Sequence, residues 1–168
     1  MIRFGALIVA LATMAAVSAR AADPALSAQA NAAYLAANAR KPGVITTPSG
    51  LQYKIIHNGY GARPSAFNKV QVAYKGKLIN GTVFDSTEPG LPATFTVNQL
   101  IPGWTEALEL MREGDEWQLV IPANLAYGAR GAGNGVIPPN QVLIFDLRLI
   151  KVLPPEKTQE DQDNGSQQ

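Results

Sequence analysis

Residues 70–152 constrain the fold of this chain most strongly, because short apolar runs with a period of two follow one another there. Val70, Val72 and Tyr74 alternate with small or polar residues, and residues 143–150 alternate in the same way. This periodicity is typical of strands with one buried face. Further strand signals fall at residues 51–56, 94–97 and 116–121. The sequence therefore predicts an antiparallel sheet, because parallel pairs need longer crossovers than these connections provide.

One helical pattern interrupts the strands of this segment. Its apolar residues recur at i, i+3, i+4 and i+7, namely Trp104, Ala107, Leu108 and Met111. Gly114 should end the helix after about two turns. We expect this helix to cover the apolar face of the sheet, with core residues Phe67, Phe95, Trp117 and Leu119. Between two apolar runs, Asn80-Gly81 predicts a two-residue hairpin.

The first residues predict an export signal. Arg3 precedes an apolar run over residues 4–17, and Ala19-Arg20-Ala21 fits a small-x-small cleavage site, so residues 1–21 are predicted to be removed. A membrane anchor is the alternative, but the run is shorter than the roughly 18 residues that a spanning helix needs. The chain has no cysteine, which excludes disulfides and attachment of lipid to cysteine. We therefore expect a soluble mature protein with no membrane span after processing.

Two further segments flank the strand-rich region. Residues 25–40 are rich in alanine and predict a helix, which Pro42 and Gly43 should end. Residues 46–50 have the composition of a turn-rich linker. The tail carries no large apolar residue and is predicted to be disordered. The expected organisation is a helix and linker at 22–47, one domain at 48–153 and a polar tail at 154–168.

Charge and residue content exclude several classes of function. Removing Arg3 and Arg20 takes Lys plus Arg from 14 to 12 against 13 Asp plus Glu, so the net charge moves from +1 to −1. That balance argues against nucleic acid or an anionic membrane as partner. A single histidine, His57, can supply neither a zinc site nor a well-placed general base. The glycines at 128–135 lead into a strand rather than a helix, unlike a phosphate loop. No metal or cofactor is expected.

The order of short motifs in the strand-rich region resembles a known family. The motifs are Tyr74-Lys75-Gly76, Phe84-Asp85-Ser86, Ile101-Pro102-Gly103-Trp104, Ala126-Tyr127-Gly128, Ile137-Pro138-Pro139 and Phe145-Asp146. Their order closely resembles the FKBP-type peptidyl-prolyl cis-trans isomerases, in particular the exported bacterial type and the isomerase domain of the macrophage infectivity potentiator group. That resemblance implies an α+β fold, an antiparallel sheet of five to six strands wrapped around one short helix, here preceded by a separate N-terminal helix.

The resemblance also implies a site. A pocket would be lined by Tyr74, Phe84, Leu100, Trp104, Ile137 and Phe145, with Val136 at its rim. The Ile101 amide and the Tyr127 hydroxyl would donate hydrogen bonds to bound carbonyl groups, and Asp85 would lie near the rotating peptide group. Taken alone, Asp85 before a serine and a threonine is typical of a turn. Many members carry an aromatic residue at the position of Ala93, and their loop at 128–135 is one residue shorter.

The implied activity is isomerisation of the bond before proline, in a periplasmic enzyme that assists the folding of exported polypeptides. Its partners would be proline-containing unfolded or partly folded chains, with tacrolimus-like macrolides as possible inhibitors. The alternative is a chaperone or binding module that uses the same pocket with little catalysis. Because residues 25–40 are all that stands before the domain, we expect a monomer.

Overall fold

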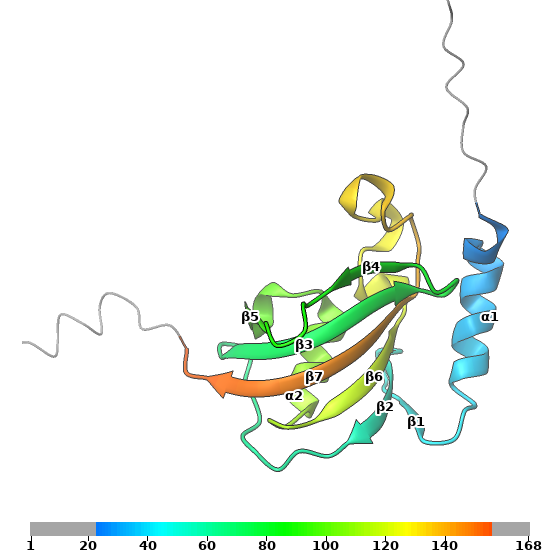
Figure 1. Ribbon diagram of the computed structural model, residues 1–168. Helices are drawn as coiled ribbons and strands as arrows, with labels where there is room; N and C mark the ends of the chain where they lie inside the picture. Colours follow the sequence, from blue (N-terminus) through cyan, green and yellow to red (C-terminus); the bar gives the residue numbers. More distant parts are fainter. Residues whose placement is uncertain (1–22, 156–168) are drawn as a thin grey trace, which may run out of the picture.

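The computed structural model describes residues 23–155, which form one antiparallel sheet and two α-helices (Figure 1). The helices are α1 (Ala28–Asn38) and α2 (Pro102–Leu110). The strands are β1 (Val44–Thr46), β2 (Gln52–His57), β3 (Lys69–Leu78), β4 (Val83–Ser86), β5 (Ala93–Thr96), β6 (Glu116–Ile121) and β7 (Leu143–Leu153). Short 3-10 turns occupy Pro24–Leu26, Val97–Gln99, Ala123–Leu125, Gly128–Arg130 and Gly133–Gly135.

The strands follow the order β1-β2-β6-β7-β3-β4, and β5 pairs with β3 beside β4. All pairs are antiparallel, and the sheet curves around α2 (Figure 1). This confirms the predicted α+β architecture. Within residues 23–155 the sheet has seven strands rather than five or six, because β1 adds an edge strand to β2.

The segment predicted as a linker is the turn of this first hairpin. The Thr47 amide donates to the Leu51 carbonyl at 2.9 Å, which closes the turn between β1 and β2. Gly50 has a φ of +97°, a left-handed conformation that glycine adopts without steric cost. The strand-rich domain is thus joined to the helix through paired backbone rather than through a free linker.

The inner face of the sheet packs against α2. Trp104, Ala107, Leu108 and Met111 are each at most 4% exposed, which confirms the predicted helical stripe. The helix ends at Leu110, before Gly114, because Met111 already has extended backbone angles of −75° and 162°. Each of these larger side chains contributes about 1.5–3 kcal/mol by leaving water, which makes this layer the main core.

Of the side chains predicted for this core, three lie in it and one does not. Trp117 and Leu119 are buried, and the half-buried Phe95 of β5 packs against the same core cluster. Trp117 stacks on Tyr53 with ring centroids 4.3 Å apart. The expectation for Phe67 is wrong, because this side chain is 69% exposed. Phe67 precedes β3, so no strand alternation directs it toward the inner face.

The outer face of the sheet carries a second, smaller apolar cluster under α1. Val120, Val142 and Ile144 are almost fully buried there, and Tyr34 and Leu35 of α1 pack on them. The alanine-rich helix is therefore docked on the sheet, which has helical cover on both faces. Among the described residues, no helix is long and apolar enough to cross a bilayer. The predicted signal at 1–21 lies outside the described residues, as does almost all of the predicted tail.

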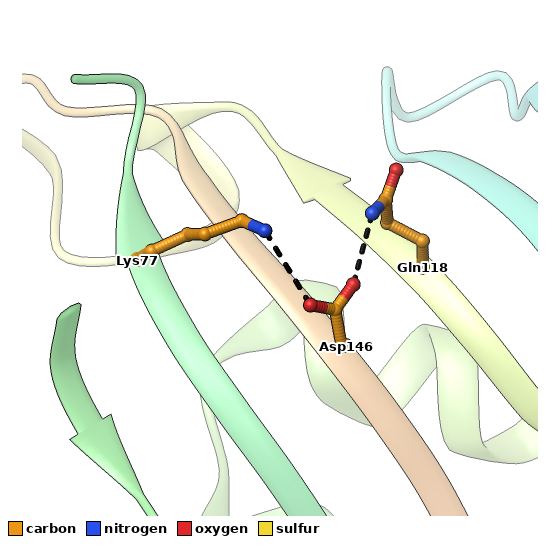
Figure 2. Close-up of polar contacts among 3 residues, drawn as sticks. All are labelled: Lys77, Gln118 and Asp146. Atoms are coloured by element: carbon orange, nitrogen blue, oxygen red, sulfur yellow. Dashed lines mark hydrogen bonds and ion pairs between the residues drawn. The ribbon is translucent and has the colours of Figure 1, made fainter. Parts of the chain in front are cut away.

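Polar side chains on three neighbouring strands meet beside this cluster (Figure 2). The Asp146 carboxylate lies 3.4 Å from the Lys77 ammonium and accepts a hydrogen bond from the Gln118 amide at 2.9 Å. Burial raises the pKa of Tyr34 above its usual value, and the negative charge of Asp146 raises it further. Asp146 on the outer face of β7 therefore interacts electrostatically with Tyr34 of α1.

Candidate active site

A ring-lined cavity of about 330 Å³ opens between the sheet and the start of α2. Its walls come from β3, β4, β5, α2, β7 and the two loops that precede α2 and follow β6. The lining residues are Tyr74, Phe84, Asp85, Phe95, Gln99, Leu100, Ile101, Trp104, Tyr127 and Phe145. Concave sites with apolar walls and a few polar groups are typical of small-molecule or side-chain binding.

Trp104 forms the centre of the aromatic cluster. Its ring meets Tyr74 edge to face at 5.1 Å between centroids, and it meets Phe145 in the same way at 5.2 Å. Phe95 contacts the indole from the third side at 6.1 Å. Edge-to-face contacts are favourable electrostatically and fix the rings in one arrangement. The indole is only 4% exposed, so it serves as a rigid floor rather than a mobile wall.

Gly76 allows two of these rings to meet above β3. A Cβ atom at this position would lie 2.7 Å from Cε1 of Phe145 and 2.7 Å from two carbons of Phe84. Carbon atoms make favourable contacts at about 3.5–4.0 Å, so a side chain here would overlap both rings. The Phe84 and Phe145 rings, 5.5 Å apart and nearly perpendicular, occupy the space that glycine leaves. The glycine of the Tyr-Lys-Gly motif is thus a packing requirement of the pocket wall.

Asp85 stands at the mouth of the cavity as an exposed carboxylate on β4. The Tyr74 hydroxyl donates a hydrogen bond of 2.6 Å to its Oδ2. Burial raises the pKa of Tyr74 well above its usual value, and the hydrogen bond and charge of Asp85 raise it further. The phenol therefore stays neutral and remains a donor, which holds the carboxylate in place at the pocket.

The Ile101 amide and the Tyr127 hydroxyl at the cavity have no protein acceptor in the part of the chain that the structure describes, and neither does the buried indole N–H of Trp104. Ile101 precedes Pro102, the first residue of α2, and its extended backbone leaves its amide outside both helix and sheet. Tyr127 is 41% exposed, and its hydroxyl bonds to none of residues 23–155. The carbonyl groups of a chain that enters the cavity can therefore accept from these donors. Unpaired donors beside an apolar wall are suited to hold a peptide group at a fixed orientation.

Eight of the ten residues predicted for the site line this cavity. Val136 and Ile137 do not: Val136 is 56% exposed on its loop, whereas Ile137 is only 6% exposed and packs in the core. Backbone bonds to Ala132 in both directions, at 2.9 and 3.0 Å, hold Ile137 in that position. The structure adds Phe95, expected only as core, and Gln99, which the sequence did not indicate. A polar residue between a short strand and a helix gives no signal for a pocket.

A larger hollow of about 590 Å³ lies elsewhere, around Tyr53, Tyr60 and Trp117. Its one carboxylate, Asp115, accepts hydrogen bonds from the amides of Gly59 and Arg112 and is committed to structure. The lining of this hollow therefore offers no free carboxylate. Among the described residues, no three His, Cys, Asp or Glu side chains are grouped to hold a metal ion.

Sequence comparisons agree with this geometry. The family model described as FKBP-type peptidyl-prolyl cis-trans isomerase matches residues 61–150. A second model, the domain amino terminal to FKBP-type peptidyl-prolyl isomerase, matches residues 6–55. The chain is 59% identical over 121 residues to Outer membrane protein MIP of Legionella longbeachae, covering 71% of this chain and 52% of that protein. It is 54% identical to the FKBP-type 22 kDa peptidyl-prolyl cis-trans isomerase of Escherichia coli, covering 71% and 58%.

Solved structures show the same fold. A peptidyl-prolyl cis-trans isomerase from Pseudomonas syringae has a TM-score of 0.70 and 38% identity, covering 75% of this chain and 92% of the other. FkpA from Escherichia coli also has a TM-score of 0.70, with 41% identity over 74% of this chain and 58% of the other. The chain spans about half the length of the curated relatives it matches. These matches confirm the resemblance read from the motifs, and the chain belongs to the family of FKBP-type peptidyl-prolyl cis-trans isomerases.

Proposed function

We propose that this protein accelerates cis-trans isomerisation of the peptide bond before proline in unfolded or partly folded polypeptides. The observation that carries the proposal is an apolar cavity lined by two unpaired donors, the Ile101 amide and the Tyr127 hydroxyl, and by the Asp85 carboxylate. A proline ring can pack on the apolar floor of the cavity while the carbonyl groups that flank it accept hydrogen bonds from these donors. Family membership supports the same reaction.

The chemistry needs no covalent step. Delocalisation of the nitrogen lone pair into the carbonyl gives the bond a rotational barrier of about 18–20 kcal/mol. In the twisted transition state the carbonyl oxygen loses negative charge, so water favours the planar ground state. Walls of Tyr74, Phe84 and Phe145 exclude that water and stabilise the twisted form relative to the planar one. An acceleration of about ten-thousand-fold corresponds to about 5.4 kcal/mol.

Each polar group has a distinct role in this proposal. Tyr127 and the Ile101 amide hold the chain on either side of the bond that rotates. Asp85 acts on the rotating unit through its charge and transfers no proton. Its hydrogen bond from Tyr74 fixes one carboxylate oxygen, which leaves the other free to face the substrate.

Variants of the two side chains test these roles in a proline-peptide isomerisation assay. Tyr127→Phe and Asp85→Asn should each lower kcat/KM about ten-fold or more while the fold stays intact. Asp85→Asn keeps the shape and an acceptor for Tyr74, so its loss of activity would report charge alone. The matched controls are Tyr60→Phe, at a tyrosine that is 91% exposed outside the cavity, and Glu88→Ala, at an exposed carboxylate nearby. Unchanged rates in both site variants would refute the assignment.

A folding chaperone or binding module that uses the same cavity is the second candidate, because the cavity is apolar and open. Two refolding assays separate the candidates. The isomerase should accelerate refolding limited by proline, and tacrolimus should inhibit it if the macrolide fits beside Ala93. A binding module would instead suppress aggregation of a substrate whose folding no proline limits, without acceleration in the first assay.

We place this activity outside the cytoplasm, in the periplasm, on the basis of the predicted signal at residues 1–21. We also propose that the processed protein is a monomer with no membrane span. Amino-terminal sequencing of secreted material should begin at Ala22, and sedimentation at micromolar concentration should give one protomer.

A further inference from the structure

Two buried asparagines on α1 attach this helix to the sheet. Asn31 and Asn38 are 4% and 3% exposed, and they lie seven residues apart on one face of the helix. Each pairs with a buried glutamine that is 5% exposed: Asn31 with Gln141, just before β7, and Asn38 with Gln52 of β2. Buried amides are unfavourable unless they are hydrogen-bonded, so these pairs fix the helix in one position rather than merely covering apolar surface.

The Asn31 pair reaches the segment that precedes β7. The Asn31 side chain donates to Oε1 of Gln141 at 3.1 Å and accepts from the Val142 amide at 2.8 Å. The Gln141 side chain in turn donates to the Pro139 carbonyl at 2.9 Å and to the Leu26 carbonyl at 3.1 Å. Three hydrogen bonds therefore connect Asn31 and the turn before α1 to Gln141 and Val142, and a fourth lies within residues 139–142.

Residues 139–142 in turn contact the segment that carries Tyr127. The Asn140 amide donates to the carbonyl of Gly128, the residue after Tyr127, at 2.8 Å. Asn140 and Gly128 have φ values of +59° and +55°, in a left-handed region that asparagine adopts more readily than most other non-glycine residues do. The surroundings of Asn140 include the Gln141 contacts described above. Hydrogen bonds and the covalent backbone of residues 139–141 thus link Asn31 to Gly128, the residue after Tyr127.

We propose that Asn31 and Gln141 are positioning residues for the isomerase reaction. They fix the backbone at Asn140 and Gly128, and through it the Tyr127 hydroxyl at the mouth of the cavity. The inference rests on the proposed function, because it assigns to α1 a role in the reaction that this cavity carries out. Helix α1 then supports the geometry of the site, although none of its residues lines the cavity.

The second pair provides a matched control within the same helix. Asn38 donates to Oε1 of Gln52 at 2.9 Å, and the Gln52 side chain donates to the Leu35 carbonyl at 3.0 Å. Gln52 belongs to β2, and no residue of β2 lines the aromatic cavity. The two pairs match in residue type and burial but differ in whether they reach the Tyr127 segment.

Asn31→Ala and Asn38→Ala, compared in the purified protein, test the proposal. Both variants should lose stability toward urea, and Asn31→Ala should lose more, because it leaves the Val142 amide as well as the Gln141 side chain without a partner. At a temperature where both are folded, Asn31→Ala should lower kcat/KM at least five-fold, whereas Asn38→Ala stays within two-fold of the wild type. Equal effects in the two variants would overturn the proposal. An inactive wild type would instead refute the proposed function itself.

A double-mutant cycle with Tyr127→Phe separates positioning of the hydroxyl from a general effect on the pocket. In this background Asn31→Ala should change kcat/KM less than two-fold, because the group that it positions is absent. An undiminished five-fold loss would overturn the proposal. If Asn31→Ala does not fold, amide exchange in the wild type decides. The Asn140 and Val142 amides should exchange at a common rate, as parts of one opening unit, and fast exchange of Asn140 alone would overturn the proposal.

Discussion

Replacement of Gly76 by alanine probes how tightly the aromatic wall is packed. The glycine lies in β3, and its φ is outside the left-handed region, so the backbone itself accepts alanine. The added methyl group would lie 2.7 Å from ring carbons of both Phe84 and Phe145. Reaching a contact distance of about 3.5 Å requires displacements of about 0.8 Å. Neither ring can move freely, because Phe145 also packs edge to face on Trp104.

Two opposing terms set the size of the effect. Adding a methyl group to a packed core typically destabilises by about 1–3 kcal/mol. Replacing glycine by alanine in an acceptable backbone conformation stabilises by about 0.4–1 kcal/mol through the unfolded state. From central values of about 2 and about 0.7 kcal/mol, we expect the free energy of unfolding to fall by about 1.3 kcal/mol. The displaced rings should also weaken binding of a ligand in the cavity.

Urea denaturation and titration with a cavity ligand measure the two effects separately. The unfolding midpoint should fall with an unchanged m-value, since the surface exposed on unfolding is the same. The control is Gly76→Ala in a Phe84→Leu background, where the smaller side chain gives the methyl group room and the added loss should shrink. Wild-type stability together with wild-type ligand affinity would refute the packing role of Gly76.

The remaining predictions concern charge. Because burial and Asp85 raise the pKa of Tyr74, its stabilising contribution is present below its unfolded value of 10.0 and is lost as pH rises through the higher folded pKa. Phenolate absorbance should therefore show that Tyr74 ionises at a higher pH than an ordinary tyrosine. Uniform ionisation of all tyrosines near pH 10 would contradict this. Asp146→Asn should lower the pKa of Tyr34 in the same titration. A double-mutant cycle for Lys77 and Asp146, whose side chains are 31% and 44% exposed, should give at most about 1 kcal/mol of coupling, decreasing with salt.

The sequence was sufficient to predict the inner layer of this fold, because that layer depends on periodicity. Strand alternation in β3, β6 and β7 and the helical stripe of α2 each direct apolar side chains to one shared face. Burial of that face is the dominant favourable contribution to folding. The ring set of the cavity was predictable for a different reason. Its motifs match a family, and periodicity alone would have assigned Tyr74 and Phe145 to the core.

The residues that were misplaced lie where no periodicity applies. Phe67 stands in the irregular segment before β3, and Val136 and Ile137 belong to a loop whose two ends are fixed by backbone hydrogen bonds. Side-chain direction in such segments follows from long-range contacts, which a local pattern does not contain. Gln99 enters the cavity for the same reason, since its place depends on how the turn after β5 meets α2.

The alanine content predicted helix α1 itself but not its docking on the sheet, because the buried face of the helix is partly polar. Asn31 and Asn38 are indistinguishable in the sequence from solvated residues, and the alanines around them supply little apolar signal. The distant residues Gln52 and Gln141 help to make this burial favourable, since their side-chain oxygens accept hydrogen bonds from the amides of Asn38 and Asn31. Complementary polar pairs specify one docking position more narrowly than an apolar stripe of equal size, because a shift along the helix would break both of these hydrogen bonds. A helix docked in this way can hold the Tyr127 segment in a fixed position, whereas a loosely packed alanine helix could not.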